Sequence, residues 1–420
     1  MSDIKLTTLD NGVRVLTDYV PSVESAALGI WAGVGTRNEE LSNNGAAHMV
    51  EHMLFKGTQK RDAAKIAEEI ENVGGSMNAY TSRELTSYHI HLLKDDAPLA
   101  LDVLADMYRG SSFPDEEIER ERGVILQEIG MCNDTPDDVI FDLHFETSYP
   151  DQAFGAPILG REHNIKEMSR EALQGYAQRF YQGHNTVISA SGNIEHDAFV
   201  EQVRTLFADM PSGEKAPTQS AHYKGGEIRQ EKDLEQSHFI LSFEGLARLD
   251  EDYYTAQALS TILGAGMSSR LFQEVREKRG LVYSIFSYHS GYQDAGQFGI
   301  YAGTGPEKMG EIMPVICDEV LKLGSSITEE ELVRAKAQLK ASLLMSRESM
   351  MRRADQNAKG LIFRDQIFEQ EALAAKIDAV DLKDLEDVAA KIFATKPTLS
   401  ALGPLSELES YDKLEQRLAA

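Results

Sequence analysis

Hydrophobic and polar positions along the chain recur with two different periods, and these periods predict strands and helices in turn. Alternation in "GVRVLTDYV" and "SAALGIWAGV" predicts two strands near the N-terminus, and "MNAYTSRELTSYHIHLL" predicts a strand hairpin. A helical period covers residues 44–56, with Gly57 placed to end that helix, and a second helix is predicted from about Ala63.

The second half of the chain repeats this order loosely. "HFILSFEG" predicts a strand, "DYYTAQALSTILG" a helix, and "LVYSIFSYHSGYQDAGQFGIYAGT" a hairpin. Longer helices are predicted at about 306–323 and 329–360. Hairpins mixed with helix pairs indicate an α+β fold of two related domains, each a mainly antiparallel sheet covered by helices. The repeated order suggests a distant internal duplication.

A stretch rich in proline and glycine, "MPSGEKAPTQSAHYKGG", interrupts the pattern and has little apolar periodicity. We interpret residues 210–226 as a linker. It separates an N-terminal domain, 1–209, from a C-terminal related domain, 227–420.

Composition limits the possible partners. The formal net charge of −26 predicts a soluble chain that repels nucleic acid and attracts cationic peptides, although acidity can also serve solubility alone. Two cysteines, Cys132 and Cys317, exclude a disulfide framework and fit a reducing compartment. No apolar run approaches the ~20 residues of a membrane span, and the first residues, "MSDIKLTTLDNG", have no signal or transit pattern.

Three polar residues stand out in the apolar helical stretch "AAHMVEHMLFKGT": His48, Glu51 and His52. Residues three and four apart point to one side of a helix, so all three share a face. Two imidazoles at this spacing can hold one metal ion beside a carboxylate that acts on water, and His-x-x-Glu-His is a known zinc motif. Alone, the motif leaves open two ordinary histidines near a glutamate.

A third ligand can come from "EEIERERGVILQEIGM", where Glu121 and Glu128 lie nearly two helical turns apart. Glu128 has apolar neighbours, and a buried carboxylate needs a partner such as a metal. A solvent-facing glutamate beside the core is the alternative. His89 and His91 share one face of a predicted strand, as a metal pair or as a hydrogen-bonded or exposed pair.

The stretches "GVGTRNE", "GAAHMVEHMLFKGT", "GGSMNAYTSRELTSYHI" and "EEIERERGVILQEI" resemble the pitrilysin, insulin-degrading enzyme and mitochondrial processing peptidase family of zinc metallopeptidases. The similarity is greatest to the processing peptidase β-subunit type and its bacterial relatives. It continues through "FGAPILGREHNIKEM" and "MSSRLFQEVREKRGLVYSI" and covers nearly the whole chain. In that family a ligand glutamate follows the inverted histidine motif at a spacing similar to the 76 residues between positions 52 and 128 here.

The resemblance implies a role for each matching residue. His48, His52 and Glu128 would bind one Zn²⁺ per chain, and Glu51 would be the general base. Glu121 would be a second acidic residue of the catalytic group, orienting a ligand. The remaining implied residues would contact the substrate: Asn78 and Ala79 on an edge strand that pairs with the peptide, and Arg276 and Tyr283 at its carbonyl. Without the resemblance, Arg276 and Tyr283 would be an exposed helix residue and a strand aromatic.

The resemblance therefore implies a zinc metalloendopeptidase that hydrolyses peptides or presequence-like segments inside a closed chamber. Basic peptides would suit an acidic lining. A homodimer is expected, because one chain carries both the zinc motif and the Arg–Tyr pair, and a heterodimer with a paralogue is the alternative. We expect a bacterial cytoplasmic protein, with a mature mitochondrial matrix protein as alternative. A non-catalytic structural or peptide-binding subunit is the other function class.

Overall fold

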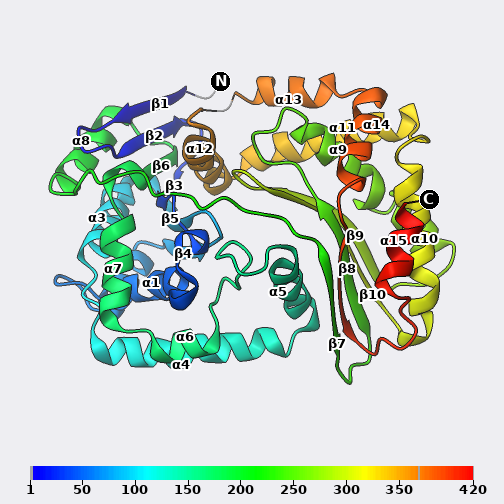
Figure 1. The fold of residues 1–420 in the computed structure, drawn as a ribbon. Coiled ribbons are helices and arrows are strands. Elements are labelled where there is room, and N and C mark those ends of the chain that lie inside the picture. The colour runs from blue at the N-terminus through cyan, green and yellow to red at the C-terminus, as the bar shows by residue number, and fades with distance from the viewer. Residues whose placement is uncertain (1–2, 368, 420) are drawn as a thin grey trace. The chain divides into compact units, whose positions relative to one another are not determined.

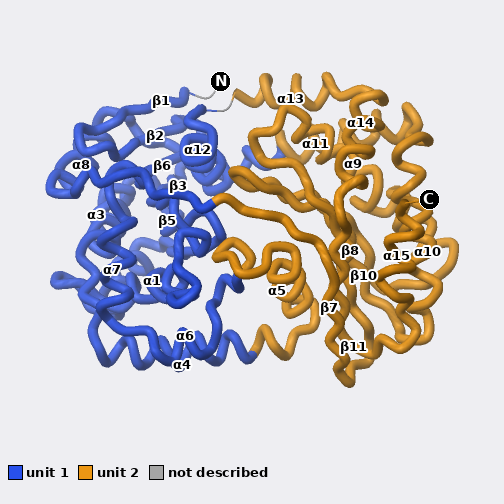
Figure 2. Tube along the Cα trace, viewed as in Figure 1, with its two compact units in different colours: residues 1–130, 156–219, 345–368 blue, residues 131–155, 220–344, 369–420 orange. Residues whose placement is uncertain are grey.

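The computed structural model describes residues 3–367 and 369–419. It has the predicted α+β architecture, with two mainly antiparallel sheets covered by helices (Figure 1). The chain forms two compact units (Figure 2). Unit 1 contains residues 1–130, 156–219 and 345–368, and unit 2 contains 131–155, 220–344 and 369–420.

Unit 1 has a six-stranded sheet in the order β1-β2-β6-β3-β5-β4, with only β2 and β6 parallel. Its strands are β1 (Asp3–Thr8), β2 (Arg14–Tyr19), β3 (Ser25–Ala32), β4 (Ser76–Thr81), β5 (Thr86–Leu93) and β6 (Thr186–Gly192). Its helices are α1 (Ala46–Leu54), α2 (Ala63–Glu71), α3 (Ala97–Gly110), most of α4 (Asp115–Asn133), α6 (Glu162–Glu167), α7 (Arg170–Phe180), α8 (His196–Leu206) and α12 (Met350–Arg364). The sheet leaves β4 as an edge strand.

Unit 2 has a five-stranded sheet in the order β7-β11-β8-β10-β9. Its strands are β7 (Gly226–Glu231), β8 (Ser237–Glu244), β9 (Ser284–Gly291), β10 (Gly296–Thr304) and β11 (Thr398–Gly403). Its helices are α5 (Pro136–Ser148), α9 (Tyr253–Gly264), a π-helix (Phe272–Glu277), α10 (Met309–Lys322), nearly all of α11 (Glu329–Met345), α13 (Gln370–Ala379), α14 (Leu382–Phe393) and α15 (Tyr411–Leu418).

The two sheets have the same topology. The strands β2, β6, β3, β5 and β4 of unit 1 correspond in order to β7, β11, β8, β10 and β9 of unit 2. In both series the first pair is parallel and the next three pairs are antiparallel. Unit 1 adds β1 as a sixth strand. The shared topology confirms two related domains.

Each unit includes one helix that is separated in sequence from most of the rest of the unit. Helix α12 follows most of unit 2 in sequence but packs on β2, β3 and β6 of unit 1. Its Ala354, Ala358 and Leu361 form a core with Trp31 and Val187. Reciprocally, α5 precedes nearly all of unit 2 in sequence and packs on β7, β8 and β11. The contact-defined units therefore consist of three segments each, and the sequence boundaries 1–209, 210–226 and 227–420 stay a prediction.

One predicted element differs from the structure. The single helix expected at 329–360 is two helices, α11 and α12, separated by a 3-10 turn at Ser346–Glu348. The Ser349 hydroxyl accepts the Arg352 amide and so caps a new helix. This local cap overrides the continuous helical pattern.

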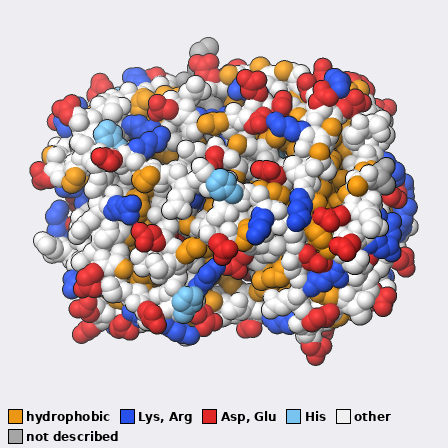
Figure 3. Space-filling view, in the orientation of Figure 1, with side chains coloured by type: hydrophobic (Ala, Val, Ile, Leu, Met, Phe, Trp, Pro, Cys, Tyr) orange, Lys and Arg blue, Asp and Glu red, His pale blue; other side chains and the backbone are white. Residues whose placement is uncertain are grey.

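Charged side chains of both signs lie on the molecular surface. Acidic, basic and uncharged side chains are interspersed on the face shown in Figure 3. Within residues 3–367 and 369–419, no helix combines the length and apolar character needed to cross a membrane.

Candidate metal centre

Helix α1 carries three of the predicted site residues and is fixed by its apolar face. Ala47, Met49, Val50 and Met53 are fully buried in the core of unit 1. Packing of these residues leaves the face with His48, Glu51 and His52 for the site.

The start of α1 requires a glycine and a buried acid. Gly45 has φ +101°, and a Cβ there would lie 2.6 Å from Ile165 Cδ1. The Glu39 carboxylate accepts the amides of Gly45 at 3.0 Å and Ala47 at 2.7 Å, and the Asn44 side-chain amide at 3.0 Å. Side-chain oxygens at a helix N-terminus satisfy amides that have no partner within the helix. Glu39 thus anchors the helix that carries the site.

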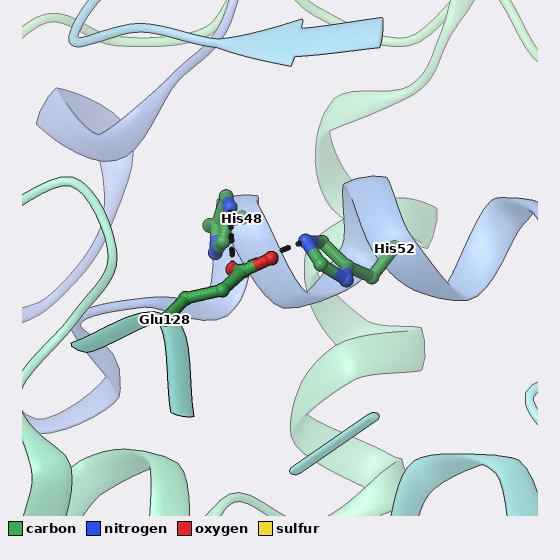
Figure 4. Close-up of side chains that lie close together, drawn as sticks. All are labelled: His48, His52 and Glu128. Atoms are coloured by element: carbon green, nitrogen blue, oxygen red, sulfur yellow. Dashed lines mark ion pairs between the residues drawn. The ribbon is translucent and has the colours of Figure 1, made fainter. Parts of the chain in front are cut away.

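The predicted ligands lie together. One ligand atom from each of His48, His52 and Glu128 lies within 4.8 Å of the others, and Figure 4 shows the three side chains converging from α1 and α4. The Glu128 Oε2 is 3.9 Å from His48 Nε2 and 3.7 Å from His52 Nε2. These separations exceed hydrogen-bond length.

The environments of the two histidines differ. Burial, with the neighbouring His52, lowers the pKa of His48 to about 3, so its imidazole is neutral. Burial also lowers the pKa of His52, but the hydrogen bond to Glu121 and the surrounding carboxylates outweigh it and raise that pKa overall. A neutral imidazole is the form that binds metals.

Glu121 is hydrogen-bonded to the ring nitrogen of His52 that does not face Glu128. Its Oε2 lies 2.9 Å from His52 Nδ1, and its Oε1 lies 2.8 Å from Lys56 Nζ. Burial acts to raise the pKa of Glu121, but the interactions with His52 and Lys56 outweigh burial, and the pKa is lowered overall. The Glu121 carboxylate therefore stays ionised. With Nδ1 held by Glu121, the Nε2 of His52 is directed to Glu128. This contact suits the ligand-orienting role predicted for Glu121.

Glu51 is held by the end of strand β4. The Thr81 hydroxyl donates to Glu51 Oε2 at 2.5 Å. Burial raises the pKa of Glu51, only partly offset by that hydrogen bond and by His52. A carboxylate with a raised pKa is a better proton acceptor near neutrality, as a general base requires.

The donor set fits zinc. Two imidazole nitrogens and one carboxylate oxygen are typical zinc ligands that leave a fourth position open. Ligand atoms about 2.0–2.1 Å from zinc at a tetrahedral angle would lie roughly 3.3 Å apart, so small side-chain rotations suffice. The buried Nδ1 of His48 has no hydrogen-bond partner among the described residues. The other ring nitrogen, Nε2, faces Glu128 and is the atom that would bind the metal.

The predicted substrate-docking residues lie on the edge strand β4. Asn78 pairs with His89 of β5 and Ala79 with Tyr88, while the other side of β4 has no strand neighbour in the described sheet. The Ala79 amide donates to the Asn78 side chain at 2.8 Å. An unpaired edge of this kind can accept a peptide as a further strand.

Comparisons with known proteins identify the family. The profile described as insulinase, peptidase family M16, matches residues 14–162, and the M16 inactive-domain profile matches residues 167–339. An uncharacterized zinc protease of Streptomyces coelicolor is 38% identical over 97% of this chain and 91% of its own. The chain belongs to peptidase family M16.

Other M16 relatives come from bacteria and a plant. An uncharacterized zinc protease of Bacillus subtilis is 36% identical over 97% of this chain and 100% of its own. The "Probable mitochondrial-processing peptidase subunit beta" of Arabidopsis thaliana is 35% identical over 99% of this chain and 81% of its own. A crystal structure of a protease from Helicobacter pylori shares the fold, with a TM-score of 0.90 at 24% identity over 96% of this chain and 100% of that one.

The two substrate-contacting residues that the family resemblance predicts in the second half of the chain, Arg276 and Tyr283, lie in unit 2. Arg276 is in the π-helix, with its guanidinium 4.7 Å from the centre of the Phe272 ring. Tyr283 precedes β9, and its side chain is largely exposed, at 77%. Exposure leaves the Tyr283 hydroxyl accessible, and substrate contact by either residue stays a prediction.

Sequence reasoning missed Glu39, Thr81 and Lys56 as parts of the site. Glu39 and Thr81 both lie inside stretches that carry the family resemblance, but nothing in their spacing connects them to α1. Lys56 is four residues after His52, a helical spacing that could have indicated a shared partner. His89 stacks on Trp31, which favours a packed histidine over a metal pair with His91.

Proposed function

We propose that this M16 chain is a zinc-dependent endopeptidase that hydrolyses peptides. The observation that carries the proposal is the convergence of His48, His52 and Glu128 beside Glu51. A zinc ion bound there would act as a Lewis acid and would lower the pKa of a bound water molecule to ~7.

The residues of the chain would divide the remaining work. Thr81 occupies Oε2 of Glu51, so we assign proton transfer to Oε1. Glu51 takes a proton from the attacking water there and passes it to the leaving amine. The substrate backbone pairs with β4 at Ala79, which positions the scissile bond near Thr81. Arg276 and Tyr283 are assigned to the substrate carbonyl by the family resemblance.

A closed chamber requires a second chain in this proposal. We propose a homodimer, since this sequence contains both the zinc motif and the Arg–Tyr pair. Short unfolded peptides, including presequence-like and basic ones, are the proposed substrates. A bacterial cytoplasmic location is proposed because several M16 relatives are bacterial.

The proposal is tested by metal analysis and a quenched-fluorescent peptide assay with and without chelator. We expect one zinc per chain and hydrolysis that chelation abolishes and zinc restores. Glu51→Gln should keep zinc and lose about 10²–10⁴-fold in kcat, the typical contribution of a general base. The exposed Glu68→Gln in α2 is the matched control.

Two results would contradict the proposal. Hydrolysis by Glu51→Gln at the parent rate would remove Glu51 as the base. Stoichiometric zinc without hydrolysis of any peptide in a broad library would favour the non-catalytic, peptide-binding alternative.

A further inference from the structure

A cavity of about 500 Å³ lies in unit 1, on the side of the sheet that faces α12. It is lined by Val23, by Ser25 of β3, by residues 76–78 of β4, by His89 and His91 of β5, and by residues 348–351, which lead into α12. Tyr88, Ile90 and Leu92 of β5 point to the opposite, α1 side, where they join the main core. The cavity and the metal centre therefore lie on opposite faces of the same strand pair.

The backbone of β4 shows which groups a docked peptide would meet. The Ser82 amide donates across the hairpin to the Leu85 carbonyl, so Ser82 points toward β5. Neighbouring residues of an antiparallel strand direct their backbone groups to opposite sides. Thr81, Ala79 and Met77 thus present amides and carbonyls to the free edge. The bond from the Ala79 amide to the Asn78 side chain agrees with this.

A peptide added to this edge would alternate its side chains between the two faces. Residues opposite Ala79 and Met77 would lie on the α1 face, toward the metal centre. Residues opposite Asn78 and Ser76 would lie on the α12 face, where both line the cavity. At ~3.3 Å per residue, Asn78 and Ser76 lie roughly 10 and 17 Å along the strand from Thr81.

The lining favours one kind of side chain. Met350 and Met351 supply thioethers, which contact aromatic rings favourably. The His89 ring is stacked at 11° on Trp31, and burial keeps it neutral by lowering its pKa. Glu348 contributes a carboxylate, and neither lysine nor arginine is among the lining residues. An acidic side chain would therefore meet a like charge, whereas an aromatic ring finds thioethers and an imidazole.

We propose that this cavity is a specificity pocket for an aromatic side chain of the substrate, located a few residues from the scissile bond. The inference rests on the proposed peptidase function, because it takes the edge strand as the docking strand. It adds a recognition site on the sheet face opposite the metal centre.

The test compares peptides that differ at one position. Quenched peptides carry Phe, Ala or Asp at each position up to six residues on either side of the cleaved bond, and kcat/KM is measured. We expect one position at which Phe exceeds Ala by about 10- to 100-fold, the range given by burial of a large apolar side chain, and at which Asp is poorest. Anisotropy of labelled peptides on zinc-loaded Glu51→Gln measures the same preference without catalysis.

Variants connect the preference to the cavity. Ser76→Trp fills it from the exposed face of β4 and should reduce the Phe/Ala ratio to within about twofold. Met351→Ala removes a thioether and should lower the ratio less. Lys5→Trp, on the opposite edge strand, is the control and should leave the ratio unchanged.

The outcomes separate this inference from the peptidase proposal. Hydrolysis with no aromatic preference, or a preference that survives Ser76→Trp, overturns the pocket and leaves the peptidase intact. If no peptide is hydrolysed, the peptidase proposal fails, and the anisotropy ratio alone decides whether the pocket binds aromatic side chains.

Discussion

Two buried carboxylates next to α1 behave in opposite ways, and the difference follows from their partners. Glu121 has a cation, Lys56, and an imidazole within hydrogen-bond distance, and its pKa is lowered. The donors to Glu39 among the described residues are all neutral, and burial raises its pKa to about 7 although three amides lower it in part. The charge of Glu121 is therefore permanent near neutrality, whereas that of Glu39 depends on pH.

Glu39 should give the fold a measurable pH dependence. Its pKa in the folded state exceeds the ordinary value of 4.5, so the fold favours the protonated acid. The contribution of Glu39 to stability is fully present below pH ~4.5 and is lost as the pH rises to about 7, a change of order 3 kcal/mol. Unfolding by denaturant at several pH values should show that the difference between the parent and Glu39→Gln shrinks or reverses over this range.

The neighbouring exposed Glu40 provides the control for Glu39. Glu40→Gln should leave the pH profile of the parent unchanged. A parent-minus-Glu39→Gln difference that stays constant from pH 4.5 to 8 would refute the assignment.

Glu121 should matter for metal affinity rather than for stability alone. Glu121→Ala frees the Nδ1 of His52, and loss of such a ligand-orienting partner typically weakens metal binding by about 10- to 100-fold. Competition with a chromogenic chelator measures the zinc affinity. Glu119→Ala, at an exposed position of the same helix, should not change it, and equal losses in both variants would argue against a specific role.

At the residue scale, the sequence predicted the site residues whose positions follow from helical spacing. His48, Glu51 and His52 share a face because they are three and four residues apart, and Glu128 was indicated by its apolar neighbours and the family spacing. Thr81 was not predicted, because its hydrogen bond to Glu51 joins distant segments and depends on how β4 packs against α1. Glu39 was not predicted either, although its partners are only five to eight residues later, because periodicity does not give the conformation of the turn before α1.

At the scale of elements, β4 both borders the cavity and reaches the metal centre. Its Thr81 holds Glu51, its Ala79 presents an amide to the free edge, and its Ser76 lines the cavity. Alternation in the sequence predicted this hairpin, and the family resemblance indicated its role. The break between α11 and α12 was missed, because apolar periodicity continues through a turn that one serine cap creates.

Proline at position 79 should block docking without disturbing the sheet. The Ala79 amide points away from β5, so Ala79→Pro removes an edge donor and leaves the pairing with β5 in place. We expect kcat/KM to fall about tenfold or more with zinc content unchanged. Ala79→Val keeps the donor and serves as control, and an equal loss in both variants would show that the amide is not used.

At the scale of the whole molecule, the reciprocal positions of α5 and α12 are the main feature that the sequence did not predict. A periodic pattern shows that a helix has an apolar face but not which sheet that face covers. The two halves predicted on either side of the linker are continuous in sequence. The contact-defined units are not, because residues 345–368 belong to unit 1 and residues 131–155 to unit 2.

A buried ion pair attaches α12 to unit 1. The fully buried Asp18 of β2 accepts from Arg353 at 2.6 and 2.8 Å and from Arg347 at 3.3 Å. Asp18→Ala leaves these guanidinium groups without that partner and should destabilise unit 1 by about 3–5 kcal/mol. Hydrogen exchange should show lost protection in β2, β6 and α12 together, whereas the exposed Asp10→Ala should match the parent. Loss of protection in α12 alone would show that the sheet of unit 1 is stable without the packing of this helix.

The late position of α12 in the sequence also bears on synthesis. The face of β2, β3 and β6 that contains Trp31 and Val187 is made early, but the residues that cover it, 345–368, leave the ribosome after most of unit 2. At ~5–20 residues per second, about 6–25 s pass between residues 219 and 345. During that interval the nascent chain exposes an apolar sheet face, so we expect it to depend on chaperones until α12 arrives.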